Sequence, residues 1–348
     1  MRLGVDTKIA ILLHEGVKGV YGKTGLALLR FSEAPIVAVI DRQCAGESLP
    51  QLTGINRDVP IVASVEQALT YAPDVLVIGI APSGGVLPDE WLDEIKQAVS
   101  AGVSIVNGLH TPMAKIPQLQ AILTDKQWIW DVRQEPANIA IASAKAQTLS
   151  CQRVLTVGTD MGIGKMSTSL ELHKAAQKQG LRSHFLATGQ TGIMISGDGV
   201  ALDAVRVDYA AGAVEQLVMR YGDSDILHVE GQGSLLHPGS TATLPLIRGT
   251  QPTALILVHR VGQTHIRNHP HVPIPSLNEV IKLYQSVASA AGAFKPAKVV
   301  GIALNTAHLD STAAELAITQ TQAETGLPCT DAVRYGAEVL LNAVGKNQ

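Results

Sequence analysis

Short apolar runs alternate with stretches of helical periodicity along the whole chain, and this alternation predicts its elements. The segment Asp89–Ser100 reads DEWLDEIKQAVS, with acidic residues in its first turn and apolar residues at helical spacing. Strands that alternate with such helices indicate βαβ units around a parallel sheet. In the first half, the expected strands are Lys8–Leu13, Pro35–Ile40, Val59–Ser64, Val75–Ile80 and Val103–Asn107, and the expected helices are Thr24–Phe31, Ser64–Tyr71 and Asp89–Ser100.

The alternation starts again in the second half, after a stretch without clear periodicity. Residues 133–152 are rich in Ala, Ser and Gln, so we place a boundary there, between a domain at 1–135 and a domain at 150–348. We expect an α/β protein with two doubly wound parallel-sheet domains, the first of them Rossmann-like. In the second half, the expected strands are Arg153–Val157, His184–Ala187, Ile226–Glu230, Ala254–His259 and Val299–Asn305, and the expected helices are Lys165–Gln179, Asp208–Tyr221, Ser276–Ala288 and Ser311–Glu324.

Composition narrows the class of protein. A chain of 348 residues is long enough for two domains, and with 46% hydrophobic but only 3% aromatic residues its cores must consist of Ala, Val, Ile and Leu. The net charge of -3 and the lack of a basic block argue against nucleic acid as a partner. Cys44, Cys151 and Cys329 lie too far apart for a zinc site or a disulfide framework.

The N-terminus has no signal-peptide h-region, and no apolar run approaches the roughly 18 residues of a membrane helix. We therefore expect a cytoplasmic protein that acts on a small-molecule substrate without a membrane partner. A homo-oligomer is compatible with these observations.

The strongest motif is a glycine-rich turn between a β run that ends at Val157 and a helix that begins near Lys165. This strand–loop–helix context is that of a P-loop, in which backbone N–H groups and the helix N-terminus surround phosphate oxygens. It predicts a P-loop NTPase-like second domain. The expected cofactor-binding residues are Gly158, Thr159, Asp160, Gly162, Gly164, Lys165, Ser167 and Thr168.

Two departures from the common P-loop pattern limit what the motif predicts. Five residues separate Gly158 from Gly164, one more than in G-x-x-x-x-G-K, and Met166 stands where Ser or Thr normally holds Mg²⁺. The neighbouring Ser167 and Thr168 are candidates to replace that hydroxyl, although their register differs. The motif therefore predicts phosphate binding more strongly than it predicts hydrolysis of Mg-ATP.

The spacing of Gly158-Thr159-Asp160 and Gly164-Lys165 resembles the P-loop of dethiobiotin synthetase, and Val229-Glu230-Gly231 resembles the acidic motif of that enzyme. A closer resemblance, over most of the chain, is to the family called domain of unknown function 1611. Its motifs are GTD-x-x-x-GKM-[ST]-[ST], VEGQGSL-x-HPG and G-x-x-LNT, with APSGG and GLH in the first domain. They are found here at 158–168, 229–239, 301–306, 81–85 and 108–110. The resemblance implies a D-glutamate N-acetyltransferase that uses acetyl-CoA.

Two residues near the second motif are candidate bases. Alternation along the expected strand puts Ile226, His228 and Glu230 on one face, with Glu230 at the carboxyl end, where ligands of parallel sheets bind. His237 follows on the next loop, and an unperturbed histidine takes up a proton near neutral pH. We expect either Glu230 or His237 to deprotonate the substrate amine. For His228 we expect a satisfied interior histidine.

The segment from His259 to His271 follows another expected strand end. Arg260 and Arg267 suit the binding of two carboxylates, as a dicarboxylate substrate requires. Its histidines lie among prolines on a loop, so we expect no metal there. Asp198, Asp203 and Asp208 lie where some P-loop proteins hold Mg²⁺, but Asp208 fits better as the N-cap of the following helix.

Glycine-rich turns in the first domain give weaker signals. The turn at His14–Gly25 does not fit G-x-G-x-x-G with a following acid, so it indicates an NAD site only weakly. Lys23 and Thr24 open the next helix, and Pro82–Gly85 forms another turn after a strand; both are candidates to bind CoA.

Three functions remain in contention from sequence alone. The first is an acetyl-CoA-dependent N-acetyltransferase whose P-loop binds cofactor phosphates, with an acidic amino acid as acceptor. The second is an ATP- and Mg²⁺-dependent carboxylate ligase of the dethiobiotin-synthetase type, with Glu230 at the metal. The third is a nucleotide-binding protein without catalysis.

Overall fold

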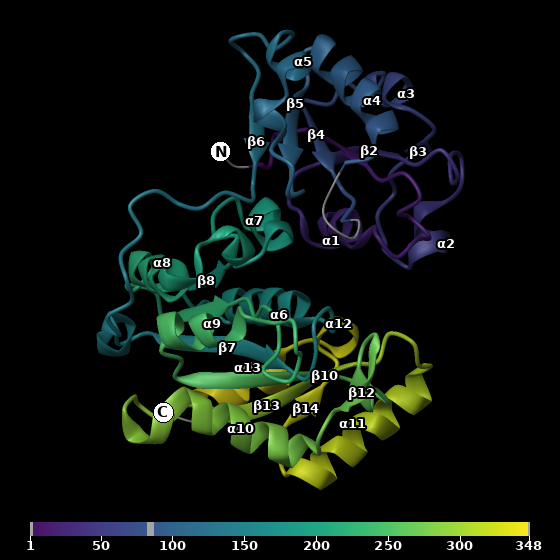
Figure 1. Cartoon of the computed structure of the whole chain (residues 1–348). Helices are drawn as coiled ribbons and strands as arrows, with labels where there is room; N and C mark the ends of the chain where they lie inside the picture. The colour runs from purple at the N-terminus through teal and green to yellow at the C-terminus, as the bar shows by residue number, and fades with distance from the viewer. Residues whose placement is uncertain (1–2, 82–86, 347–348) are drawn as a thin grey trace. The chain divides into compact units, whose positions relative to one another are not determined.

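A computed structural model of the chain describes residues 3–81 and 87–346. Two compact units form, one from residues 1–134 with 193–201 and the other from 135–192 with 202–348 (Figure 1). Both are built on six-stranded parallel sheets, which confirms the predicted fold class. No helix among the described residues is long and apolar enough to cross a lipid bilayer.

The first unit is a doubly wound sheet of the Rossmann type. Its strands follow the order β3-β2-β1-β4-β5-β6 and pair in parallel throughout, so the direction of winding reverses between β1 and β4. Helix α4 begins with Asp89 and Glu90 and buries Trp91, Ile95 and Val99 on one face, as its periodicity predicts. The elements are β1 (Ile9–Leu12), α1 (Lys23–Phe31), β2 (Ile36–Ile40), α2 (Leu49–Thr53), β3 (Ile61–Val62), α3 (Val65–Leu69), β4 (Val75–Ile78), α4 (Asp89–Ser100), β5 (Ser104–Asn107), α5 (Pro117–Gln120) and β6 (Ile129–Asp131).

The second unit has the strand order β14-β13-β10-β7-β9-β8, again all parallel. Its central strand is β7, in which Val154 pairs with Ala254 of β10 on one side and His228 of β9 on the other. The elements are β7 (Gln152–Gly158), α6 (Lys165–Lys178), β8 (Ser183–Leu186), α7 (Gln190–Ser196), α8 (Val207–Arg220), β9 (Ile226–Val229), α9 (Thr243–Thr250), β10 (Ala254–Arg260), β11 (His265–Ile266), β12 (His269–Pro273), α10 (Leu277–Ser289), β13 (Lys298–Asn305), α11 (Ser311–Thr325), β14 (Cys329–Thr330), α12 (Ala332–Tyr335) and α13 (Glu338–Gly345).

Aliphatic side chains fill the core of the second unit, as the low aromatic content predicts. Val154, Leu172, Ile226, Ile256 and Leu340 belong to one buried cluster on the side of the sheet where α6 and α13 pack. Burial of each such side chain contributes about 1.5–3 kcal/mol, and this holds β7 and its following turn in place.

Local signals explain where two long helices begin. Ser276 and Glu279 form a capping box at the start of α10, and the Asp310 carboxylate accepts a hydrogen bond from Ala313 N–H at the start of α11. The expected N-cap at Asp208 is wrong, because α8 begins one residue earlier, after Arg206, and Asp208 lies in its first turn.

Candidate active site

The loop from Gly158 to Lys165, called the P-loop below, joins the carboxyl end of β7 to the first residue of α6. Gly162 and Gly164 have φ angles of 67° and 116°, which favour glycine. Within residues 3–81 and 87–346, no hydrogen bond uses the N–H groups of Gly162, Ile163 or Gly164. Three consecutive amide donors at a helix N-terminus form a site for phosphate oxygens.

Lys165 lies inside this loop with only 5% of its surface exposed. Its Nζ donates a hydrogen bond to the carbonyl oxygen of Asp160 at 2.6 Å. Burial lowers the pKa of Lys165 to about 8, against the opposing effect of the Asp160 and Glu230 charges. A Cβ at Gly231 would lie 2.9 Å from Lys165 Cδ and 1.8 Å from the Thr156 carbonyl oxygen, so only glycine leaves room for the lysine stem.

The Asp160 carboxylate is bonded on both of its oxygens. The group is 1% exposed, and its Oδ1 accepts a hydrogen bond from Met161 N–H at 2.6 Å. Its Oδ2 accepts from Gln263 Nε2 at 2.5 Å and from the Arg267 backbone N–H at 2.7 Å. Asp160 therefore ties the P-loop to the segment Arg260–Pro273, called the hairpin below, in which β11 and β12 pair in antiparallel fashion.

A buried tyrosine holds the first residue of the P-loop. Tyr284 of α10 donates a hydrogen bond from its hydroxyl to the Gly158 carbonyl oxygen at 2.7 Å and accepts one from Leu235 N–H at 3.1 Å. This one side chain thus joins the P-loop to residues 231–239, called the acidic-motif loop below. The sequence offered no sign of this role, because Tyr284 lies within a helical apolar pattern.

Two strand-end residues hold the middle of the P-loop. A hydrogen bond of 3.0 Å joins His259 Nδ1 at the end of β10 to Thr159 Oγ1. Asn305 at the end of β13 donates from Nδ2 to the Ile163 carbonyl oxygen at 3.0 Å. Burial lowers the pKa of His259 to about 4, so its ring is neutral at pH 7. Their places at carboxyl strand ends were the signal that would have identified both residues.

Glu230 follows β9 and is only 3% exposed. Its Oε2 accepts hydrogen bonds from Thr188 N–H at 2.9 Å and Gly189 N–H at 3.1 Å, and its Oε1 accepts from Gln232 Nε2 at 3.0 Å. Burial raises the pKa of Glu230 to about 7, although these donors and Lys165 favour the charged form. The structure therefore places Glu230 beside the P-loop, with its carboxylate largely occupied by N–H donors.

The residues after Lys165 have different surroundings. Thr168 is buried and donates its backbone N–H to the Gly164 carbonyl oxygen, while Ser167 is half-buried. Ser169 lies deeper, where its Oγ is 3.0 Å from Thr156 Oγ1.

His237 lies half-buried on the acidic-motif loop. Its Nδ1 accepts a hydrogen bond from Gly239 N–H at 3.1 Å, so a neutral His237 carries its proton on Nε2. Its ring contacts that of His269 edge to face, with centroids 5.0 Å apart, and His269 and His271 are 6.0 Å apart. The acidic-motif loop thus meets the hairpin. No three His, Cys, Asp or Glu side chains of the described chain are arranged to hold a metal ion.

Arg260 and Arg267 are both exposed. Arg260 ends β10, and Arg267 lies in the turn between β11 and β12. The backbone N–H of Arg267 donates a hydrogen bond to the Asp160 carboxylate. The hairpin therefore carries the Arg267 side chain from a backbone position that is attached to the P-loop.

The expectation of a satisfied histidine at position 228 is wrong. His228 is 0% exposed, and neither ring nitrogen has a hydrogen-bond partner among the described residues. Burial lowers the pKa of this histidine to about 3, and the nearest ring is that of His173, 6.3 Å away between centroids. A neutral ring in this position fills space within the core.

The first residues of the glycine-rich turn in the first unit are held by an acid of the same unit. Asp41, just after β2, is 1% exposed and accepts hydrogen bonds from the N–H groups of Glu15, Val17 and Gln43. In dinucleotide-binding folds an acid near this place binds a ribose hydroxyl, but here the carboxylate is already occupied. The turn at Pro82–Gly85 lies outside the described residues.

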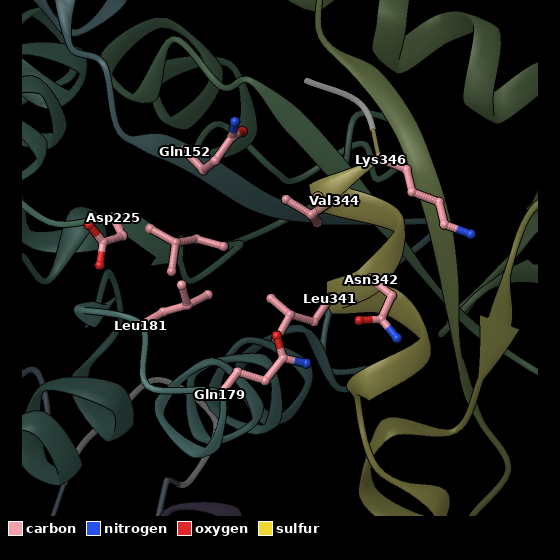
Figure 2. A pocket seen from close by; sticks show the side chains of 10 residues that line it. Gln152, Gln179, Leu181, Asp225, Leu341, Asn342, Val344 and Lys346 are labelled. Atoms are coloured by element: carbon pink, nitrogen blue, oxygen red, sulfur yellow. The ribbon is translucent and has the colours of Figure 1, made fainter.

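A separate pocket of about 380 Å³ lies at the opposite end of the second sheet (Figure 2). Gln152 and Ile226 are the first residues of β7 and β9, whereas the P-loop follows the last residue of β7, roughly 20 Å along the strand. Leu341 and Val344 of α13 line its apolar side. The pocket therefore forms no part of the P-loop, which lies at the other end of β7. The carboxylate in its lining, that of Asp225, is paired with Arg182 at 2.6 Å.

Comparison with known proteins confirms the resemblance drawn from the motifs. Residues 140–341 match the P-loop domain of the family described as a domain of unknown function, DUF1611, and residues 42–135 match its Rossmann-like N-terminal domain. A D-glutamate N-acetyltransferase of Tritonibacter scottomollicae is 38% identical over 81% of this chain and 84% of its own length. One from a Pseudoalteromonas species is 36% identical over 83% and 85%. The crystal structure of a DUF1611 protein from Anabaena variabilis, 71% identical, has a TM-score of 0.96 and covers 98% of this chain and 100% of its own.

Proposed function

The chain belongs to the DUF1611 family and is an N-acetyltransferase, and from that premise we propose that it transfers the acetyl group of acetyl-CoA to the amine of D-glutamate. The observation that carries the proposal is the P-loop itself. It combines three free N–H donors and a buried lysine with an acidic residue whose oxygens already accept three hydrogen bonds. Such a loop suits the binding of phosphates better than metal-dependent phosphoryl transfer.

The residues of the P-loop fit the phosphates of CoA. Gly162, Ile163 and Gly164 would donate their N–H groups, and Lys165 would direct a further N–H donor of its ammonium group to a phosphate oxygen. Met166 carries no hydroxyl for Mg²⁺, and cofactor phosphates that do not react require none. Acetyl-CoA supplies a thioester whose carbonyl carbon the amine attacks.

Glu230 and His237 would divide the proton chemistry between them. A carboxylate with a pKa near 7 is matched to removing a proton from the substrate ammonium at neutral pH, and Glu230 Oε1 has one bonded donor, which leaves a lone pair. His237 carries its proton on Nε2, so it is suited to donate toward the developing oxyanion or the departing thiolate. As the nitrogen–carbon bond forms, the carbon–sulfur bond breaks, and the second proton that the nitrogen loses is taken up by the thiolate.

The two exposed arginines supply recognition for an acidic acceptor. D-Glutamate has two carboxylates, and guanidinium groups bind carboxylates through paired, charge-assisted hydrogen bonds. Arg260 and Arg267 are carried by the same hairpin that Asp160 attaches to the P-loop. We propose that they bind the acceptor, while the P-loop binds the donor.

The test is an assay of the purified protein with acetyl-CoA and D-glutamate. We expect free thiol to appear together with N-acetyl-D-glutamate, detected by mass spectrometry, and little product from L-glutamate. Release of ADP from Mg-ATP in the presence of a small carboxylate, without acetyl transfer, would refute the proposal and favour the ligase. Nucleotide binding without any turnover would favour the non-catalytic alternative.

A further inference from the structure

Asp160 makes two connections that run in opposite directions. Through its carbonyl oxygen it holds the ammonium group of Lys165 at 2.6 Å. Through its carboxylate it holds the hairpin, at Gln263 Nε2 and at the backbone N–H of Arg267. One residue of the loop that receives phosphate is thus also the attachment point of the segment that carries Arg267.

The first connection responds when a phosphate binds. Lys165 is 5% exposed, and its ammonium group has three N–H donors, of which one is bonded to the Asp160 carbonyl and the others can reach a phosphate oxygen. A phosphate that draws the ammonium group toward it therefore also acts on the peptide group between Asp160 and Met161, whose N–H is bonded to the Asp160 carboxylate at 2.6 Å. A rearrangement of this peptide therefore shifts the carboxylate as well, because the two groups share one residue.

The second connection passes such a shift to the hairpin. The carboxylate is 1% exposed, so water does not substitute for Gln263 and Arg267 as its partners. The hairpin has other ties, through the buried Ile266 and the ring of His269 against His237, but the backbone of Arg267 is bonded to Asp160 directly. The position of the Arg267 backbone, and of the guanidinium that it carries, therefore depends in part on where Asp160 lies.

We propose that Asp160 is a positioning residue that couples the binding of CoA at the P-loop to the binding of the acidic acceptor at the hairpin. The proposal rests on the function proposed above and adds a prediction that the function alone does not make. Coupling between two binding sites is reciprocal, so each ligand strengthens the binding of the other by the same factor. The energy of that coupling passes through the Asp160 carboxylate and Gln263.

The experiment measures the Kd of D-glutamate by calorimetry, with and without saturating CoA. For the wild-type protein we expect CoA to tighten the binding of D-glutamate by about fivefold or more, the lower end of usual couplings. Gln263→Ala removes one of the two hairpin bonds and should reduce that factor. Gln263→Glu opposes two carboxylates and should bring it to about one. In Gln263→Ala the Kd of CoA alone should stay within about twofold of the wild-type value.

Gln216→Ala is the matched control. Gln216 of α8 donates a side-chain hydrogen bond to the Asn138 carbonyl oxygen, away from the P-loop, and so matches the bond that Gln263 also donates to the His265 carbonyl oxygen but not the one to Asp160. It should leave the coupling factor unchanged. Thermal midpoints of all variants show whether each is folded, and if Gln263→Glu fails to fold, the reduction in Gln263→Ala decides the outcome.

The outcomes separate this proposal from the proposed function. A wild-type protein that acetylates D-glutamate but binds it equally well with and without CoA would overturn the coupling alone. So would a coupling factor that Gln263→Glu and Gln263→Ala leave unchanged. A wild-type protein that transfers no acetyl group would overturn the function first.

Discussion

The turn after β1 and the turn after β7 look alike in sequence but differ in what the acid beside each of them binds. Each is glycine-rich, and each leads into a helix whose first residue is a lysine, Lys23 in α1 and Lys165 in α6. In the first turn, Asp41 accepts the N–H groups of Glu15 and Val17, and Leu13 accepts that of Gly16. In the P-loop, the N–H groups of residues 162–164 have no partner among the described residues.

The difference lies in the acid and not in the glycine content of the two turns. An internal carboxylate that accepts the amide donors removes them from a ligand and adds a negative charge that repels one. In the second unit the acid of the loop, Asp160, accepts one amide donor of the loop, that of Met161, and its other oxygen is bonded to the hairpin, while side chains from α10, β10 and β13 hold the loop in place. The site depends on donors that the protein leaves unpaired.

The largest expected effect is a loss of affinity for acetyl-CoA when Lys165 is replaced, and the equivalent change at Lys23 is its comparison. Lys165→Ala removes the cation of the P-loop and should weaken the binding of acetyl-CoA by about 10- to 100-fold, since a charge-assisted hydrogen bond contributes about 1.5–3 kcal/mol. Lys23→Ala changes the equivalent position of the first unit and should leave the Kd within about twofold. Calorimetric titration with acetyl-CoA measures both. Equal losses in the two variants would contradict the distinction between the turns.

The second expected effect is a change with pH in the free energy of unfolding of the second unit, which contains the P-loop. The pKa of Glu230 rises from 4.5 to about 7 on folding, so between these values the folded chain holds a proton that the unfolded chain has released. Stability therefore falls as pH rises through this range, by at most about 3 kcal/mol. Glu230→Gln has no such proton and should lack this part of the fall.

Urea unfolding at pH 5 and pH 8, followed by circular dichroism, measures that difference. The three tryptophans, Trp91, Trp128 and Trp130, all lie in the first unit, so their fluorescence identifies its transition separately. If wild type and Glu230→Gln lose the same stability between the two pH values, the raised pKa of Glu230 is refuted.

The smallest expected effect is a loss of stability in the first unit when Asp41, beside the turn after β1, is replaced. Asp41→Asn places an amide nitrogen against a backbone N–H group, and the buried donor that loses its acceptor should cost about 2 kcal/mol. Tryptophan fluorescence in urea should show this loss in the first unit. The Kd of acetyl-CoA should not change, and a weakened Kd would mean that this turn also takes part in cofactor binding.

The long elements could be predicted because their signals are local. The expected strands and helices agree with the structure to within a few residues, as at α4 (Asp89–Ser100) and α6 (Lys165–Lys178). Short edge strands such as β6 and β14 were missed, since two or three residues carry no periodicity. The pair β11 and β12 was also missed, because its histidines and prolines look like a loop.

Sequence by itself determined the parallel α/β architecture, the family, and the P-loop with its unusual Met166, because each of these is written in a short stretch of neighbouring residues. Only the tertiary structure decided what those residues contact. Asp160 meets Gln263, Gly158 meets Tyr284 and Ile163 meets Asn305, at separations of 103, 126 and 142 positions. Whether the oxygens of Asp160 and Glu230 or the ring nitrogens of His228 have hydrogen-bond partners depends on which distant groups the fold brings within about 3 Å. No pattern of neighbouring residues encodes that distance.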